Sequence, residues 1–86
     1  MKIINIYGTT TCAFCLRAKK LCERMGLEYE YKNIEYEMYK SELDNLLTEG
    51  YRTVPQIFRY GKLIGGYNEL AKELEDTSGG FGDGKL

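Results

Sequence analysis

The chain has 86 residues, of which 43% are hydrophobic and 29% are charged, and its formal net charge is −1. This length and composition are typical of one small folded domain and exclude a disordered chain. The small net charge also argues against an overall electrostatic attraction for nucleic acid. Histidine is absent, and the only cysteines are Cys12, Cys15 and Cys22, which excludes a Cys/His or four-cysteine zinc site within one chain.

The opening of the sequence carries no export signal, and no segment approaches the roughly 20 apolar residues that span a bilayer. We therefore expect a cytoplasmic protein that does not bind membranes. In a reducing compartment cysteines serve chemistry more often than disulfide cross-links.

The first predicted elements form a strand–helix–strand unit. Residues 2–7 are β-branched and apolar on both faces, which is typical of a buried central strand. Residues 27–34 alternate apolar and charged side chains, which predicts a strand with one buried face. A helix that ends at Gly26 is predicted between them, and such a unit joins parallel strands. The apolar positions with helical spacing are Phe14, Ala18, Leu21, Cys22 and Met25.

The remaining elements are a helix, a hairpin and a last helix. The second helix is expected to end at Gly50, residues 53–66 to form a hairpin that turns at Tyr60–Gly61, and residues 67–74 to form the last helix. The apolar face of the second helix is predicted to consist of Tyr36, Tyr39, Leu43, Leu46 and Leu47.

The end of the chain differs in composition from the rest. Residues 77–86 are rich in glycine and have no periodicity, so we expect a mobile tail. The folded domain is accordingly predicted to cover residues 1–76.

Cys12 and Cys15 stand where the first helix is expected to begin. A C-x-x-C pair beside a strand–helix–strand pattern is typical of thiol–disulfide chemistry. Helix N-termini lower the pKa of a thiol, which makes it a good leaving group. Cys12 is therefore the predicted nucleophile and Cys15 the resolving cysteine, whereas Cys22 is predicted to be structural. Two structural cysteines, or half of an intermolecular metal site, are the alternatives that the spacing leaves open.

Two further segments extend the pattern: "TVP" at residues 53–55 and "GGYNEL" at residues 65–70. Together with "YGTTTCAFC", they resemble glutaredoxins of the compact bacterial and phage type, over residues 2–75. The resemblance implies the α/β thioredoxin fold, in the order βαβ-α-ββα. Its sheet would be four-stranded and mixed, with three flanking helices.

The resemblance also implies a glutathione site beside Cys12. The Val54–Pro55 peptide bond would be cis and place Pro55 against Cys12, and the Val54 backbone would pair with the cysteinyl part of glutathione. The γ-glutamyl carboxylate would lie at the start of the last helix. The other implied glutathione-binding residues are Phe14, Thr53, Gly66, Tyr67 and Asn68.

Several positions depart from the family pattern. Thr9 stands where a lysine is common, which leaves the glycyl carboxylate of glutathione to Arg52 or Lys40. Asn68 replaces a common aspartate, so charge pairing with the glutathione ammonium is weaker. Ala13 replaces the proline that often follows the first cysteine, a change that bears on the reduction potential.

The sequence thus predicts a monomeric, glutathione-dependent thiol–disulfide oxidoreductase that needs no metal. Glutathione would be the co-substrate, and protein disulfides and glutathione mixed disulfides the substrates. The resemblance makes ribonucleotide reductase a candidate electron acceptor. Two alternatives stay open: a dimer that holds a [2Fe–2S] cluster with glutathione thiolates, and a redoxin reduced by thioredoxin reductase.

Overall fold

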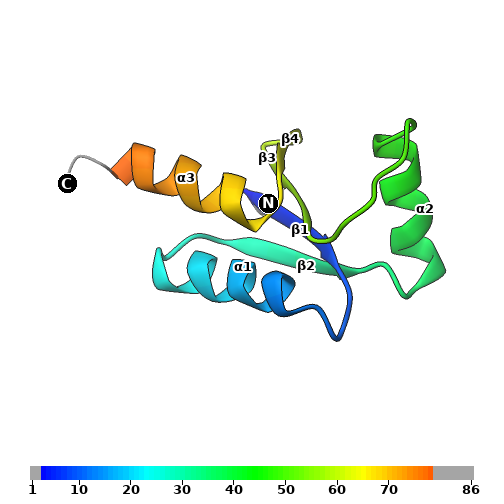
Figure 1. The fold of residues 1–86 in the computed structure, drawn as a ribbon, viewed down its shortest axis with the longest axis horizontal. Helices are drawn as coiled ribbons and strands as arrows, with labels where there is room; N and C mark the ends of the chain where they lie inside the picture. Colours follow the sequence, from blue (N-terminus) through cyan, green and yellow to red (C-terminus); the bar gives the residue numbers. More distant parts are fainter. Residues whose placement is uncertain (1–2, 79–86) are drawn as a thin grey trace.

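The structure is a computed structural model that describes residues 3–78 (Figure 1). The elements follow the predicted order βαβ-α-ββα. Of the predicted tail at residues 77–86, residues 77 and 78 form the end of the last helix, and residues 79–86 lie outside the described residues. The elements are β1 (Ile4–Gly8), α1 (Ala13–Arg24), β2 (Tyr29–Asn33), α2 (Glu37–Leu46), β3 (Gln56–Arg59), β4 (Lys62–Gly65) and α3 (Tyr67–Ser78).

The four strands form one mixed sheet in the order β2-β1-β3-β4. β1 pairs in parallel with β2 and antiparallel with β3, and β3 pairs antiparallel with β4. The parallel pairing of β1 and β2 confirms the prediction from the strand–helix–strand unit. β1 lies inside the sheet, with α1 and α3 on one face and α2 on the other, which explains why its sequence is apolar on both faces.

The two faces of the sheet bury different sets of side chains. Ile4, Ile6 and Ile57 point to one face and pack against α1 and α3. Tyr7 and Phe58, the next residues along β1 and β3, point to the other face, where α2 lies. Figure 1 shows α2 standing apart from α1 and α3. Alternation along each strand therefore divides the core into two clusters.

Both predicted helix faces were wrong in part. On α1, Phe14 and Met25 are 49% and 39% exposed, whereas Cys15 is fully buried. Phe14 lies in the first turn and borders a surface groove, so its ring does not enter the core. On α2, Leu43 is the buried residue and Leu46 is 49% exposed, because this helix packs on the sheet along a narrow stripe.

The hairpin turns where the sequence predicted. Tyr60 and Gly61 both have positive φ, 53° and 78°, which is the geometry of the tight turns that suit the twist of paired strands. Arg59 of β3 pairs with Glu73 of α3 at 2.8 Å and ties the hairpin to that helix. The hairpin thereby fixes where α3 begins.

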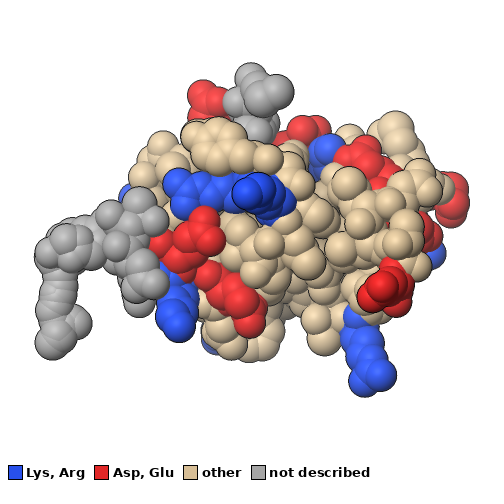
Figure 2. All heavy atoms as spheres, turned by 90° about the horizontal axis from the view of Figure 1, so that it is seen from above, with Lys and Arg blue, Asp and Glu red and all other residues tan. Residues whose placement is uncertain are grey.

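The outer surface carries both signs of charge. In Figure 2, acidic and basic side chains are interspersed around a broad uncharged area. Among the described residues, no helix is long and apolar enough to cross a membrane.

Candidate active site

Cys12 occupies the N-cap of α1, as predicted. Its backbone is extended (φ −92°, ψ 116°), and its sulfur accepts a hydrogen bond from the Cys15 backbone N–H at 3.1 Å. The Cys12 side chain is half-buried, whereas Cys15 is fully buried one turn inward. The reduced pair thus presents one accessible sulfur and one inaccessible sulfur.

The loop before β3 approaches Cys12 from the far end of the sequence. The Val54–Pro55 peptide bond is cis, and the Cys12 sulfur donates to the Val54 carbonyl oxygen at 3.5 Å. Pro55 is buried. The predicted arrangement of this segment beside the first cysteine is therefore present.

A groove of about 250 Å³ lies beside this loop, between the start of α1 and the start of α3. The rings of Phe14 and Tyr67 lie 6.1 Å apart along it, and the Arg17 guanidinium lies 5.0 Å from the Phe14 ring centre. Seven of the residues that the resemblance assigned to glutathione line this groove, whereas Arg52 does not. The lining residues are Phe14, Thr53, Val54, Pro55, Gly66, Tyr67, Asn68 and Glu69.

Glu69 is the groove residue that the sequence reasoning missed. Its carboxylate accepts a hydrogen bond from the Gly66 backbone N–H at 2.9 Å. Glu69 is the third residue of α3, and an acidic residue at this position often reaches back to the residue that caps the helix. The spacing of glycine and glutamate in "GGYNEL" is the signal that identifies this contact.

The two cations proposed for the glycyl carboxylate lie outside the groove lining. Arg52 is exposed in the loop just before Thr53. Lys40 pairs with Asp44 at 3.2 Å on the exposed side of α2. Of the two residues, Arg52 is thus the nearer along the chain to the groove, because it directly precedes Thr53.

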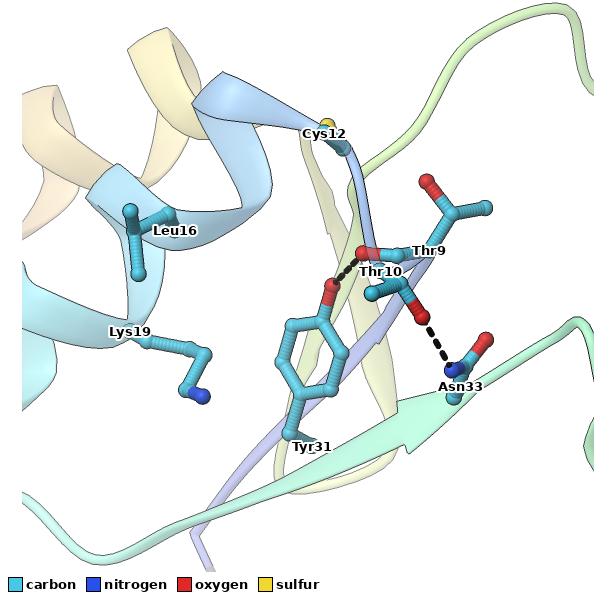
Figure 3. A pocket seen from close by; sticks show the side chains of 7 residues that line it. All are labelled: Thr9, Thr10, Cys12, Leu16, Lys19, Tyr31 and Asn33. Carbon is cyan, nitrogen blue, oxygen red and sulfur yellow. Dashed lines mark hydrogen bonds between the residues drawn. The ribbon is translucent and has the colours of Figure 1, made fainter.

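A second groove, also of about 250 Å³, borders Cys12 on the side of the β1–α1 loop (Figure 3). The Tyr31 hydroxyl donates to the Thr9 carbonyl oxygen at 2.6 Å, and the Asn33 amide donates to the Thr10 hydroxyl at 3.0 Å. β2 therefore holds the loop that leads to Cys12. The lining residues are Thr9, Thr10, Cys12, Leu16, Lys19, Tyr31 and Asn33.

Comparison with known proteins identifies the family. The family model described as glutaredoxin matches residues 4–64. This chain belongs to the glutaredoxin family. It is 39% identical to glutaredoxin-C6 of Oryza sativa over 85 residues, which is 96% of this chain and 70% of that protein. It is 38% identical to glutaredoxin 1 of Escherichia coli over 78 residues, which is 84% of this chain and 92% of that protein.

Solved structures of glutaredoxins share the fold. The crystal structure of a buckwheat glutaredoxin–glutathione complex superimposes with a TM-score of 0.74 at 31% identity. The match covers 88% of this chain and 71% of the buckwheat chain. The chain thus has the α/β thioredoxin fold, and it is a glutathione-dependent disulfide oxidoreductase with a dithiol C-x-x-C pair.

The buried thiol of this glutaredoxin is held in its protonated form. Burial, and then the hydrogen bond with the Cys12 thiol, raise the pKa of Cys15, which reaches about 11. The Thr9 backbone and the Tyr31 hydroxyl act in the opposite direction, because both hydrogen-bond the thiolate. At neutral pH, Cys15 is therefore a thiol.

Gly8 and Tyr31 are two more residues of the site that the sequence reasoning missed. A Cβ atom at Gly8 would lie 2.5 Å from the Cys15 sulfur and 2.5 Å from the Tyr31 hydroxyl oxygen, so only glycine fits there. Buried tyrosines usually find a partner for their hydroxyl, and that was the available signal for Tyr31.

Cys22 lies apart from this chemistry. It is fully buried in the cluster between α1, α3 and the sheet, where burial raises its pKa to about 11. This agrees with a structural cysteine. Among the described residues, no group of three or more His, Cys, Asp or Glu side chains could hold a metal ion.

Proposed function

We propose that Cys12 is the nucleophile of this glutaredoxin and that Cys15 resolves the mixed disulfide. The Cys12 thiolate attacks a substrate disulfide, one substrate thiolate leaves, and a mixed disulfide with Cys12 forms. Cys15 or a glutathione thiolate then breaks that bond. The observation that carries the proposal is the half-buried Cys12 sulfur at the N-cap of α1, accepting the Cys15 N–H at 3.1 Å.

The difference between the two thiols supports this division of roles. Thiolates, not thiols, attack disulfides. Cys15 has a raised pKa of about 11 and no solvent exposure, so it does not compete for substrate. Its position one helical turn from Cys12 suits an attack on the Cys12 sulfur only after a mixed disulfide has formed.

Glutathione is proposed to lie in the groove between Phe14 and Tyr67. Its cysteinyl backbone would pair with Val54, which precedes a proline and borders Cys12. Because Glu69 holds the Gly66 N–H, the γ-glutamyl carboxylate would use the next N–H groups of α3, at Tyr67 and Asn68. The Glu69 carboxylate would face the γ-glutamyl ammonium. Arg52 stays the proposed partner of the glycyl carboxylate.

The protein substrates belong to the same proposal. We infer a monomer in the cytoplasm that reduces protein disulfides and glutathione mixed disulfides, with ribonucleotide reductase as one candidate acceptor. The sequence predicted a folded domain of residues 1–76, but α3 continues to Ser78, so we propose that the domain extends at least to that residue.

The test is the reduction of a small glutathione mixed disulfide and of a protein disulfide, with glutathione and glutathione reductase as the electron source. Cys12→Ser should abolish both reactions. Cys15→Ser should abolish only the part of protein disulfide reduction that needs a resolving thiol. Cys22→Ala, which removes the remaining thiol, should preserve both activities.

Retention of activity by Cys12→Ser would contradict the assignment of the nucleophile. A preference for thioredoxin reductase over glutathione as the source of electrons would contradict the role of glutathione. Anaerobic reconstitution with iron and sulfide tests the cluster alternative, since a colourless monomer eliminates it.

A further inference from the structure

The hydroxyl of Tyr31 lies beside the Cys15 sulfur, outside the glutathione groove. A Cβ atom built on Gly8 would lie 2.5 Å from the Tyr31 hydroxyl oxygen and 2.5 Å from the Cys15 sulfur. The oxygen and the sulfur are therefore neighbours across Gly8. The hydroxyl donates its proton to the Thr9 carbonyl oxygen at 2.6 Å, as Figure 3 shows. The same hydroxyl is also within hydrogen-bonding reach of Cys15, so Thr9 and Cys15 are alternative acceptors for its proton.

We propose that Tyr31 is a positioning residue for the resolving cysteine. Its hydroxyl turns from the Thr9 carbonyl oxygen to the Cys15 sulfur when that sulfur becomes a thiolate, and this stabilises the attacking form. The proposal rests on the proposed function, because only a resolving Cys15 has to pass through a thiolate.

The chemistry of the step requires such a donor. In the mixed disulfide, Cys15 loses its proton, and its thiolate attacks the Cys12 sulfur. The Cys12–Cys15 bond forms, the bond from Cys12 to the substrate sulfur breaks, and the departing thiolate takes up a proton. Two electrons pass to the substrate, and Tyr31 keeps its own proton throughout. Histidine is absent from the sequence, and the groups that stabilise the Cys15 thiolate are the Thr9 backbone and then the Tyr31 hydroxyl.

The surroundings of Tyr31 keep it available as a donor. Burial raises the pKa of its phenol above the ordinary value, with further increases from Cys15, Cys12 and Glu35. The Lys19 ammonium lies 4.9 Å from the centre of the ring. Those four side chains are the ionisable groups that face this hydroxyl, and none of them removes its proton at neutral pH.

The expected effect follows from thiolate chemistry. The hydroxyl lowers the pKa of Cys15 against the larger opposing effect of burial. A roughly tenfold lower thiolate fraction would be offset in part by a roughly threefold higher nucleophilicity of the more basic thiolate. Resolution by Cys15 should then slow by roughly threefold.

The experiment compares Tyr31→Phe with Tyr29→Phe. Tyr29 lies on the same strand, and its hydroxyl donates to Glu23 at 2.5 Å, near Cys22 and not at the Cys12–Cys15 pair. Protein disulfide reduction, with insulin as the probe, depends on resolution and should slow roughly threefold in Tyr31→Phe alone. Reduction of a small glutathione mixed disulfide by glutathione needs only Cys12. It should be unchanged in Tyr29→Phe, and Tyr31→Phe should slow it less than insulin reduction, because the lost hydroxyl also bonds the Thr9 carbonyl in the loop before Cys12.

Two further measurements separate positioning from a structural role. In a Cys12→Ser background, the pH midpoint for ionisation of Cys15, followed by the NMR chemical shift of its Cβ because the sulfur is inaccessible to reagents, should move upward when Tyr31→Phe is added. In a Cys15→Ser background, Tyr31→Phe should slow the reaction of Cys12 less than it slows protein disulfide reduction in the wild-type background.

Equal slowing of both reactions, or no slowing of either, would overturn the proposal for Tyr31. A wild-type protein without glutathione-dependent activity would overturn the proposed function instead, so the two failures are distinguishable.

Discussion

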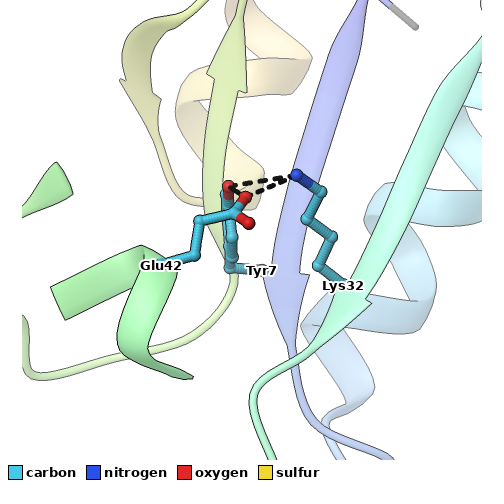
Figure 4. A network of polar contacts seen from close by, with 3 residues as sticks. All are labelled: Tyr7, Lys32 and Glu42. Atoms are coloured by element: carbon cyan, nitrogen blue, oxygen red, sulfur yellow. Dashed lines mark hydrogen bonds and ion pairs between the residues drawn. The ribbon is translucent and has the colours of Figure 1, made fainter. Parts of the chain in front are cut away.

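The two faces of the sheet are stabilised in different ways. The face covered by α1 and α3 is apolar: eight buried side chains form one cluster that includes Ile6, Cys22 and Leu70. Among the described residues, the face covered by α2 buries a smaller cluster of Tyr7, Leu43 and Phe58. There the packing is supplemented by a polar cluster of Tyr7, Lys32 and Glu42 (Figure 4).

The active site belongs to the apolar face. The first turns of α1 and α3 supply Cys12, Phe14 and Tyr67, and both helices are fixed by the larger cluster. α2 contributes none of the residues that line either groove beside the cysteines. Positional precision at the cysteines therefore depends on one face, whereas the other face contributes mainly to stability.

The largest expected effect is that of Leu70→Ala. Leu70 is fully buried on α3, so truncation should lower the free energy of unfolding by about 2–5 kcal/mol. It should also raise the KM for glutathione, because α3 forms one wall of the groove. Chemical denaturation and steady-state kinetics measure the two effects. Leu63→Ala, at a position 50% exposed, should change the stability by no more than roughly 0.5 kcal/mol.

Leu43→Ala makes the same truncation on the α2 face. We expect a loss of about 2 kcal/mol, at the low end of the range, because the smaller cluster near the surface can relax around the cavity. The KM for glutathione should stay at its wild-type value. A rise in KM equal to that of Leu70→Ala would contradict the division between the faces.

Glu42→Gln should have a smaller effect that depends on pH. Hydrogen bonds from Lys32 and then Tyr7 hold the pKa of Glu42 below its ordinary value of 4.5. A carboxyl with a lowered pKa stabilises the folded state above pH 4.5, and this contribution is lost as the pH falls through the lowered value. The free energy of unfolding should therefore fall less steeply with acidification in Glu42→Gln than in the wild type.

At neutral pH we expect Glu42→Gln to cost about 1 kcal/mol, because the Glu42 side chain is 38% exposed and water screens the pair. Asp44→Asn is the matched control. It removes the pair of Lys40 and Asp44, in which both side chains are about half exposed, and should change stability by less than roughly 0.5 kcal/mol. Similar losses in both variants would show that the polar cluster has no special role.

The smallest effect is expected at the loop before Cys12. Hydrogen bonds from the Thr10 hydroxyl and backbone hold the pKa of Glu35 below its ordinary value of 4.5. Thr10→Val removes the hydroxyl, so an NMR titration should show the pKa of Glu35 moving up toward that value. Thr11→Val, the control, should leave the pKa of Glu35 unchanged. The free energy of unfolding near neutral pH should hardly change in Thr10→Val, because Glu35 is fully exposed to water.

Local patterns predicted the order of the elements, and the resemblance to glutaredoxins implied the fold and most of the groove residues. The cysteine pair, the Thr-Val-Pro segment and the glycine pair each constrain a few neighbouring positions. Tyr31 and the polar cluster depend instead on the register of β1 and β2, which places Ile6 opposite Tyr31 and Tyr7 opposite Lys32. No local pattern specifies that register, so these contacts required the structure.

The helix faces show a related limit. Helical spacing identified α1 and α2, yet Phe14 and Leu46 are about half exposed and Cys15 is buried. Periodicity gives the direction of an apolar stripe but not its width or where the neighbouring element stops. Those depend on how far each helix overlaps the sheet.

The depth of Cys22 makes it a natural reporter of unfolding. Cys12 is half-buried in the reduced chain, whereas Cys22 has no exposed surface in the cluster that α1 and α3 share. A brief pulse of thiol reagent should modify Cys22 only in molecules whose apolar face has opened. The rate of that modification, followed by mass spectrometry, would give the opening free energy of the face that carries the active site.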